Sequence, residues 1–90
     1  MSKDRKKMLG DRLRGYRRKR RMSQTEVAEL IGAKRQSISA WENGVTLPSA
    51  LQIADLAMAY CISAHVLLFG EELKALSFRF PSVASLGQVE

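Results

Sequence analysis

The sequence predicts one small all-α domain of five short helices. Ninety residues are the length of a single domain. Apolar side chains recur at helical spacing, and glycines, serines and prolines divide them into short stretches. No alternation typical of a strand occurs before Ser77. A hydrophobic fraction of 46% is enough to build a core, so a disordered chain is excluded.

Residues 9 to about 21 are expected to form the first helix, preceded by a basic N-terminal arm over residues 1–8. Leu9, Leu13 and Tyr16 stand at positions i, i+4 and i+7, which places them on one face of a helix. The other faces are almost wholly basic. We therefore expect the helix to pack its apolar face on the core, and the arm to stay mobile.

Cap signals delimit two further helices joined by a short turn. Ser23 and Glu26 form the capping-box pattern, in which each side chain satisfies a backbone amide at the start of a helix. Gly32 ends this helix, because glycine readily adopts the left-handed conformation. The next helix runs roughly from Arg35 to Glu42 and stops at the Asn-Gly pair that follows.

Serine and glycine also delimit the last two helices. Ser49 can cap the most apolar helix of the chain, which ends near Tyr60. Ser63 can cap a fifth helix over residues 64–69, and Gly70 ends it. The five helices together predict a folded domain that is followed by a short C-terminal extension.

The domain should span residues 9–70 and the extension residues 71–90, which fray toward the end. Phe78 and Phe80 have no obvious partner in so small a core, which suggests a contact surface. We expect a dimer interface to be formed by apolar side chains on both sides of Gly70: Val66, Phe69, Leu73, Leu76, Phe78 and Phe80. The alternative is that these side chains fold back on their own chain.

Positive charge is concentrated at one end of the chain. The formal net charge is +6, from 15 Lys and Arg against 9 Asp and Glu. Residues 1–21 carry 11 − 2 = +9, whereas residues 22–90 carry 4 − 7 = −3. Such asymmetry suggests an anionic partner, either nucleic acid or a membrane surface, although a solvated helix face would look the same. A membrane is less favoured, because the first helix needs its apolar face for the core.

The second and third helices form a helix-turn-helix pattern. Ala28 supplies the small side chain that is needed where the two helices cross, and Gly32 supplies the turn. Val27, Ile38 and Trp41 can lock the second of these helices onto the first. These residues fall within one stretch of the sequence, and their joint pattern is fairly specific.

The segments Gln24–Gly32 and Gln36–Gly44 resemble the lambda-repressor-like (Xre/Cro) family of helix-turn-helix transcriptional regulators, over about residues 9–70. The resemblance implies a compact five-helix DNA-binding domain that usually acts as a dimer on palindromic operators. The implied function is a sequence-specific binder of double-stranded DNA, a repressor acting as a homodimer through the major groove. The alternative is an antitoxin-type protein-interaction module that uses the C-terminal extension as its partner surface.

In this fold the N-terminal residues of the third helix meet base edges in the major groove. Base reading is therefore expected from Lys34, Arg35, Gln36, Ser39 and Ala40. Arginine can bind guanine bidentately and glutamine can bind adenine, so the half-site should contain a G and an adjacent A. Lys34 stands where the family often has a capping Ser or Thr, and it can contact a phosphate instead.

Phosphate contacts are expected around the start of the second helix, where backbone amides point outward. Gln24, Ser37 and Asn43 match phosphate-contact positions of the family, although Asn43 can equally be a plain helix C-cap. The expected set is Ser23, Gln24, Ser37, Asn43, Arg18 and Arg21.

Arg17 and Glu42 match a family ion pair that fixes the recognition helix. The alternative is that Arg17 is free to contact a phosphate.

The sequence shows no catalytic constellation, no cofactor motif and no metal-ligand spacing, so we expect neither enzymatic activity nor a bound small molecule. Cys61 is expected to be a small buried side chain, and Met8, Met22 and Met58 are expected to pack in the core. The single cysteine and the charged N-terminus favour the cytoplasm. The resemblance implies a bacterial or phage-infected cell, where the protein associates with the nucleoid.

Overall fold

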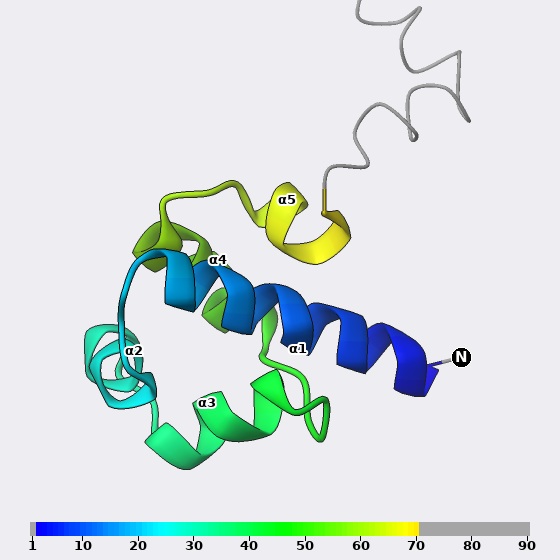
Figure 1. The fold of residues 1–90 in the computed structure, drawn as a ribbon, viewed down its shortest axis with the longest axis horizontal. Coiled ribbons are helices and arrows are strands. Elements are labelled where there is room, and N and C mark those ends of the chain that lie inside the picture. Colours follow the sequence, from blue (N-terminus) through cyan, green and yellow to red (C-terminus); the bar gives the residue numbers. More distant parts are fainter. Residues whose placement is uncertain (1, 71–90) are drawn as a thin grey trace, which may run out of the picture.

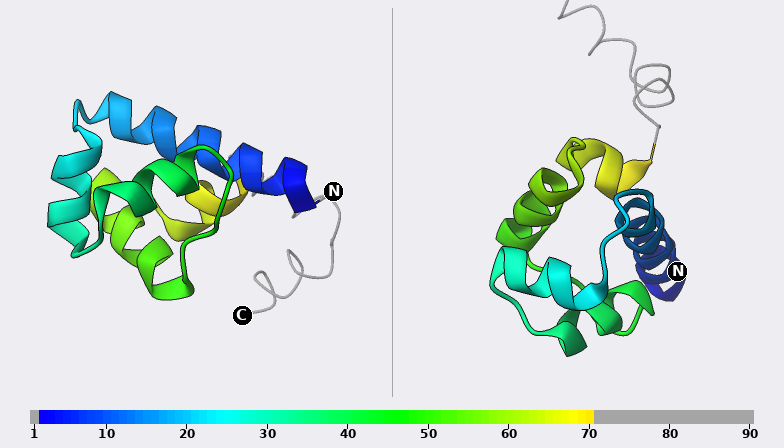
Figure 2. Two further views of the ribbon diagram at one scale, coloured as in Figure 1. Left: turned by 90° about the horizontal axis from the view of Figure 1, so that it is seen from below. Right: turned by 60° about the vertical axis from the view of Figure 1, so that its left-hand side comes forward.

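The computed structural model describes residues 2–70, with side chains from residue 5 onward. It contains five helices: α1 (Ser2–Lys19), α2 (Gln24–Ile31), α3 (Arg35–Glu42), α4 (Ala50–Tyr60) and α5 (Ala64–Phe69). In Figure 1, α1 crosses the middle of the molecule, with α3 on one side and α5 on the other. α2 packs on α3 and α4, and α5 packs on α1 and α4 (Figure 2). The predicted five-helix all-α fold is confirmed, and no strand occurs between residues 2 and 70.

Local caps end the helices where the sequence predicts. Ser23 Oγ accepts a hydrogen bond from the Glu26 amide at 3.0 Å, and Glu26 Oε1 accepts one from the Ser23 amide at 2.7 Å. Gly32 follows α2 with a φ of 72°, in the left-handed region. Ser49 and Ser63 cap α4 and α5 through their hydroxyls. Each serine cap satisfies a backbone amide that a helix leaves unpaired at its start.

The segment over residues 1–8 differs from the expected mobile arm, because α1 begins at Ser2. Lysine and arginine are good helix formers, and no residue between Ser2 and Leu9 breaks the helix. The Lys7 ammonium also lies 3.3 Å from the Asp11 carboxylate, one turn further along α1. Apolar spacing marks only the part of a helix that meets the core, and a charged run can continue the helix beyond it.

All five helices contribute to a single core. Trp41 belongs to it, with 5% of its surface exposed. The helix-turn-helix places Ala28 and Ile38 in the same core. The buried apolar residues are Leu9, Leu13, Val27, Ala28, Ile38, Trp41, Ile53, Leu56, Ala57, Tyr60 and Leu67.

Three residues expected inside the protein are exposed. Cys61 follows α4 with a φ of 57° and faces solvent, where its left-handed backbone turns the chain at the helix end. Met8 and Met58 are 51% and 73% exposed. A domain of this size covers only one face of each helix, so apolar side chains on the other face stay at the surface. Met22, in contrast, packs against the core as expected.

Arg12 of α1 and Arg20, which directly follows α1, bind the C-terminal ends of other helices. Arg20 Nε donates to the carbonyl of Tyr60, the last residue of α4, at 3.0 Å. Arg12 donates to the carbonyls of Leu67, at 2.9 Å, and of Leu68 in α5. Cations at helix C-termini satisfy unpaired carbonyls and complement the helix dipole. Part of the basic charge of α1 is therefore structural.

None of the helices in the described part of the chain is both long enough and apolar enough to cross a bilayer.

Candidate nucleic-acid interface

The N-terminal end of α3 presents a polar, cationic surface. Lys34, Arg35 and Gln36 are exposed, and Ser39 and Ala40 on the next turn are half-buried. The opposite face of α3 belongs to the interior of the protein, because its apolar side chains are buried there. The five residues expected to read bases thus lie together at the outward side of α3. Lys34 is the N-cap residue of this helix, but its side chain makes no hydrogen bond to the helix backbone.

Glu42, the last residue of α3, joins three helices from a fully buried position. Arg17 of α1 donates to both of its carboxylate oxygens, from Nε at 2.6 Å and from Nη2 at 3.0 Å. Gln24 of α2 donates from Nε2 to Oε1 at 3.1 Å. Arg17 also donates to the carbonyl of Met22, in the turn between α1 and α2. These bonds hold α3 against α1 and against the start of α2.

The charged form of Glu42 is favoured even though the side chain is buried. Burial by itself would raise its pKa, but the hydrogen bonds from Arg17 and Gln24 outweigh that effect and the pKa is lowered. The hydrogen bond to Glu42 raises the pKa of Arg17, against the opposing effect of burial. Burial, reinforced by the negative charge of Glu42, raises the pKa of Tyr60 to about 12. Arg17 and Glu42 are both charged at neutral pH, and Tyr60 is neutral.

Arg14 was absent from the predicted site, although it binds the end of α3. Its Nη2 donates to Asn43 Oδ1 at 2.8 Å, and its Nε lies 3.5 Å from Glu42 Oε1. Arg14 precedes Arg17 by three residues, which puts both on one face of α1. This spacing could have predicted the role of Arg14 from the sequence. If Arg17 binds the end of α3, a residue on the same face of α1 one turn earlier lies close enough to bind there too.

The side chain of Gln24 connects the buried pair to the exposed end of α3. Its Oε1 accepts a hydrogen bond from Arg35 Nη1 at 3.3 Å, while its Nε2 donates to Glu42. A residue expected to contact phosphate and a residue expected to read bases are therefore in contact.

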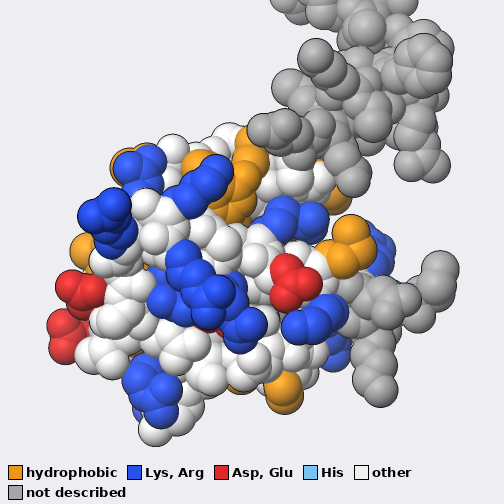
Figure 3. Space-filling model, viewed as in Figure 1, with side chains coloured by type: hydrophobic (Ala, Val, Ile, Leu, Met, Phe, Trp, Pro, Cys, Tyr) orange, Lys and Arg blue, Asp and Glu red, His pale blue; other side chains and the backbone are white. Residues whose placement is uncertain are grey.

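The other expected phosphate contacts surround the same surface. Asn43 is the C-cap residue of α3, and its amide side chain is exposed beside Ser39. Ser23 is exposed but uses its hydroxyl as the α2 cap. Arg18 and Arg21 are exposed at and beyond the end of α1, and Ser37 is half-buried. Figure 3 shows Lys and Arg side chains gathered over α1 and at the start of α3. Acidic side chains lie at the edge near α2, and one more lies among the basic side chains over α1.

The expected dimer surface is only partly described. Val66 is half-buried, and Phe69 is 42% exposed at the end of α5. The ring of Phe69 contacts that of His65, with centroids 5.0 Å apart. The other expected interface residues lie outside the described residues: Leu73, Leu76, Phe78 and Phe80. The same holds for the C-terminal extension that an antitoxin-type protein would use as its partner surface.

Two comparisons with known proteins bear on this surface. The chain matches the model of a protein family described as "Helix-turn-helix domain" over residues 8–76, which is most of its length. No curated protein matches the sequence. The matched region contains α1 from residue 8 onward and the whole of α2, α3, α4 and α5.

Proposed function

The chain belongs to the helix-turn-helix domain family, and from this premise we propose that it is a sequence-specific binder of double-stranded DNA. It acts as a transcriptional repressor that occupies a palindromic operator as a homodimer. The exposed N-terminal end of α3 enters the major groove, and α2 lies across the phosphate backbone.

One observation carries the proposal: α3 is packed on one side and free on the other. Its inner side is held by the core and by the bonds of Glu42, so its position relative to α1 and α2 is fixed. Its outer side presents Arg35 and Gln36 to solvent. A rigid helix with exposed, bidentate hydrogen-bonding side chains is what direct readout of base edges requires.

Arg35 and Gln36 are assigned to bases, and the surrounding residues to phosphates. Arginine at this place favours guanine and glutamine favours adenine. Gln24 lies at the start of α2, where free amides and the helix dipole favour a phosphate. Arg18 and Arg21 extend the cationic surface alongside. Phosphate contacts supply affinity and register, and the base contacts supply the choice of sequence.

Selection of bound sequences from a random duplex library tests the proposal. We expect an enriched, two-fold symmetric motif with half-sites about one turn (~34 Å) apart. Arg35→Ala and Gln36→Ala should each cost about 1–3 kcal/mol and relax the preference at one base position.

Arg18→Ala is the matched control, because it removes an exposed arginine that is assigned to phosphate. It should weaken binding to all sequences alike. If Arg35→Ala also weakens all sequences alike, α3 does not read bases. If no motif is enriched and any duplex binds, the protein is a non-specific basic binder.

A further inference from the structure

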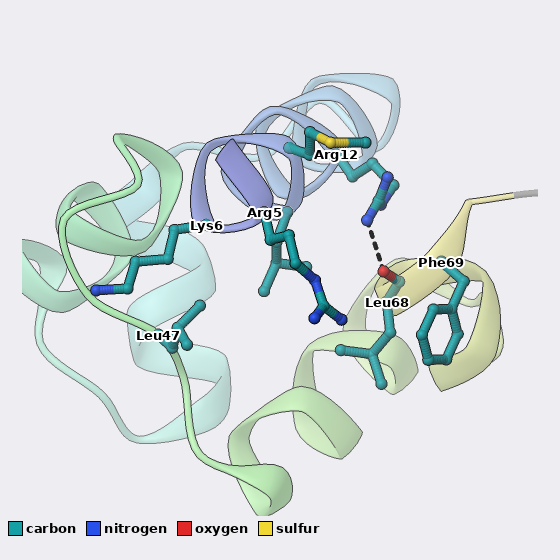
Figure 4. A pocket seen from close by; sticks show the side chains of 8 residues that line it. Arg5, Lys6, Arg12, Leu47, Leu68 and Phe69 are labelled. Carbon is teal, nitrogen blue, oxygen red and sulfur yellow. Dashed lines mark hydrogen bonds between the residues drawn. The ribbon is translucent and has the colours of Figure 1, made fainter. Parts of the chain in front are cut away.

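An open groove lies between the N-terminal half of α1, the loop that joins α3 to α4 and the end of α5 (Figure 4). Its volume is about 490 Å³. Met8, Leu47 and Phe69, which are 51%, 54% and 42% exposed, line it together with Leu68. Four large apolar side chains from three separate elements thus face one space that no other described residue fills.

Basic side chains border the same groove. Arg12 is engaged with the end of α5, whereas Arg5 and Lys6 make no ion pair with any described acid. Figure 4 shows Arg5 between Leu47 on one side and Leu68 on the other. A second copy that offered this same face would bring like charges together, which opposes a self-complementary contact. The groove fits an occupant with apolar and negatively charged side chains.

We propose that this groove is occupied by residues 71–80 of the same chain. Leu73 and Leu76 pack on its apolar floor, and Glu71 and Glu72 face the cations at its border. This inference is independent of DNA binding. It assigns the extension to its own domain rather than to a subunit interface, so the proposed homodimer uses another surface.

The chain leaves α5 at the border of the groove. Gly70 ends the helix with a φ of 69°, a conformation that lets the chain reverse its direction, and a Cβ there would lie 3.7 Å from Arg12 Nη1. Six residues span up to about 20 Å, so Leu73 and Leu76 are within reach. The two acids come first, before any basic residue of the segment. The family match extends past α5 to residue 76, which places the start of this segment in the domain.

A tether of a few residues also favours the chain's own segment over that of a second molecule. Linking two contacts in one chain gives an effective concentration in the millimolar range for short linkers. Free chains at micromolar concentration cannot compete with that.

Oxidation of methionines by hydrogen peroxide in the full chain measures whether the groove is covered. Met8 lines the groove, whereas Met58 is exposed on α4 and lies outside it. With 51% and 73% exposure, the two thioethers would be oxidised at similar rates if nothing covered Met8. A covered Met8 should be oxidised at least about five-fold more slowly than Met58, as followed by peptide mass spectrometry.

Variants of the extension then identify the cover. Leu73→Asp combined with Leu76→Asp should bring the Met8 rate close to that of Met58. Leu86→Asp makes the same change outside the proposed segment and should leave every rate unchanged. Met22, which packs against the core, reports in each case that the domain is still folded.

Two results would overturn the proposal: equal rates for Met8 and Met58 in the parent chain, or a Met8 rate that the double variant leaves unchanged. Dilution distinguishes the source of the segment. Protection by the chain's own segment stays constant over about a hundred-fold dilution, and protection lost on dilution would assign the cover to a second copy instead. No DNA is present, so the outcome is separate from that of the operator selection.

Discussion

Gly10 lies where α1 crosses the end of α3, and its missing side chain lets the two backbones approach each other. A Cβ at this position would lie 2.6 Å from the Trp41 carbonyl oxygen and 2.5 Å from that of Glu42. Gly15, on the same helix, would meet nothing within 4 Å. Glycine is therefore required for close packing at Gly10, whereas the packing around Gly15 leaves room for a side chain.

Alanine substitution at the two glycines should have opposite effects on the free energy of unfolding. Gly10→Ala forces the middle of α1 away from the end of α3 and should destabilise the protein by about 1–3 kcal/mol or more. Gly15→Ala should stabilise it by about 0.4–1 kcal/mol, because alanine loses less conformational entropy in a helix. Urea unfolding followed by circular dichroism measures both. Equal effects of the two variants would show that the close approach does not limit the packing.

At the scale of helices, α1 has two basic faces with different tasks. Arg14 and Arg17 face α3 and bind residues at its C-terminal end. Arg12, and Arg20 just beyond the end of α1, bind the carbonyl ends of α5 and α4 instead. α1 is therefore the element on which the other helices are positioned, and its charge run is only partly free for an anion.

The junction of α1, α2 and α3 at Glu42 should make stability depend on acid pH. Because the folded-state pKa of Glu42 is lowered from the usual 4.5, its contribution is complete above that value. It is lost as the pH falls through the lower folded-state pKa. Urea midpoints between pH 7 and pH 2 should therefore fall less steeply in Glu42→Gln than in the parent chain.

At pH 7 the same variant should be less stable by roughly 3–5 kcal/mol, because it leaves the charge of Arg17 without its partner. Glu29→Gln removes an exposed carboxylate from α2 and is the control for the loss of one negative charge. If the urea midpoint of Glu42→Gln falls with decreasing pH as steeply as that of the parent chain, Glu42 is not the source of the acid dependence.

For the whole molecule, the net charge of +6 overstates the charge that is available to a polyanion. Arg12, Arg17 and Arg20 are bound to carbonyls or to a buried carboxylate. Arg18 is exposed one turn beyond Arg14, on the side of α1 that adjoins α3. The salt dependence of DNA binding should follow the basic residues that have no such partner, and not the total.

Substituting two arginines that are close in sequence tests this distinction. Arg18→Ala should reduce the slope of log affinity against log salt by about 1 and leave the unfolding midpoint unchanged. Arg20→Ala should leave the slope nearly unchanged and destabilise the fold by about 1 kcal/mol, through loss of its bond to Tyr60. Titrations at several salt concentrations and urea unfolding provide the two readouts. If both variants change the salt slope equally, hydrogen bonding to the protein does not make an arginine unavailable to DNA.

The amino-acid sequence by itself determined the bounds of α2, α3, α4 and α5 and the apolar helix faces that form the core. Ser23, Gly32, Ser49 and Ser63 act on backbone groups within four residues, so their effects can be predicted from neighbours alone. The resemblance and the spacing also indicated which end of α3 is exposed.

Only the tertiary structure decided the roles that depend on residues far apart in the chain. The close approach at Gly10, the carbonyl partners of Arg12 and the exposure of Met8 all depend on which helix lies opposite. Charge patterns likewise cannot separate an arginine that caps a helix from one that faces solvent. The difference arises because caps act through local backbone geometry, whereas packing and long-range hydrogen bonds exist only once the helices are assembled.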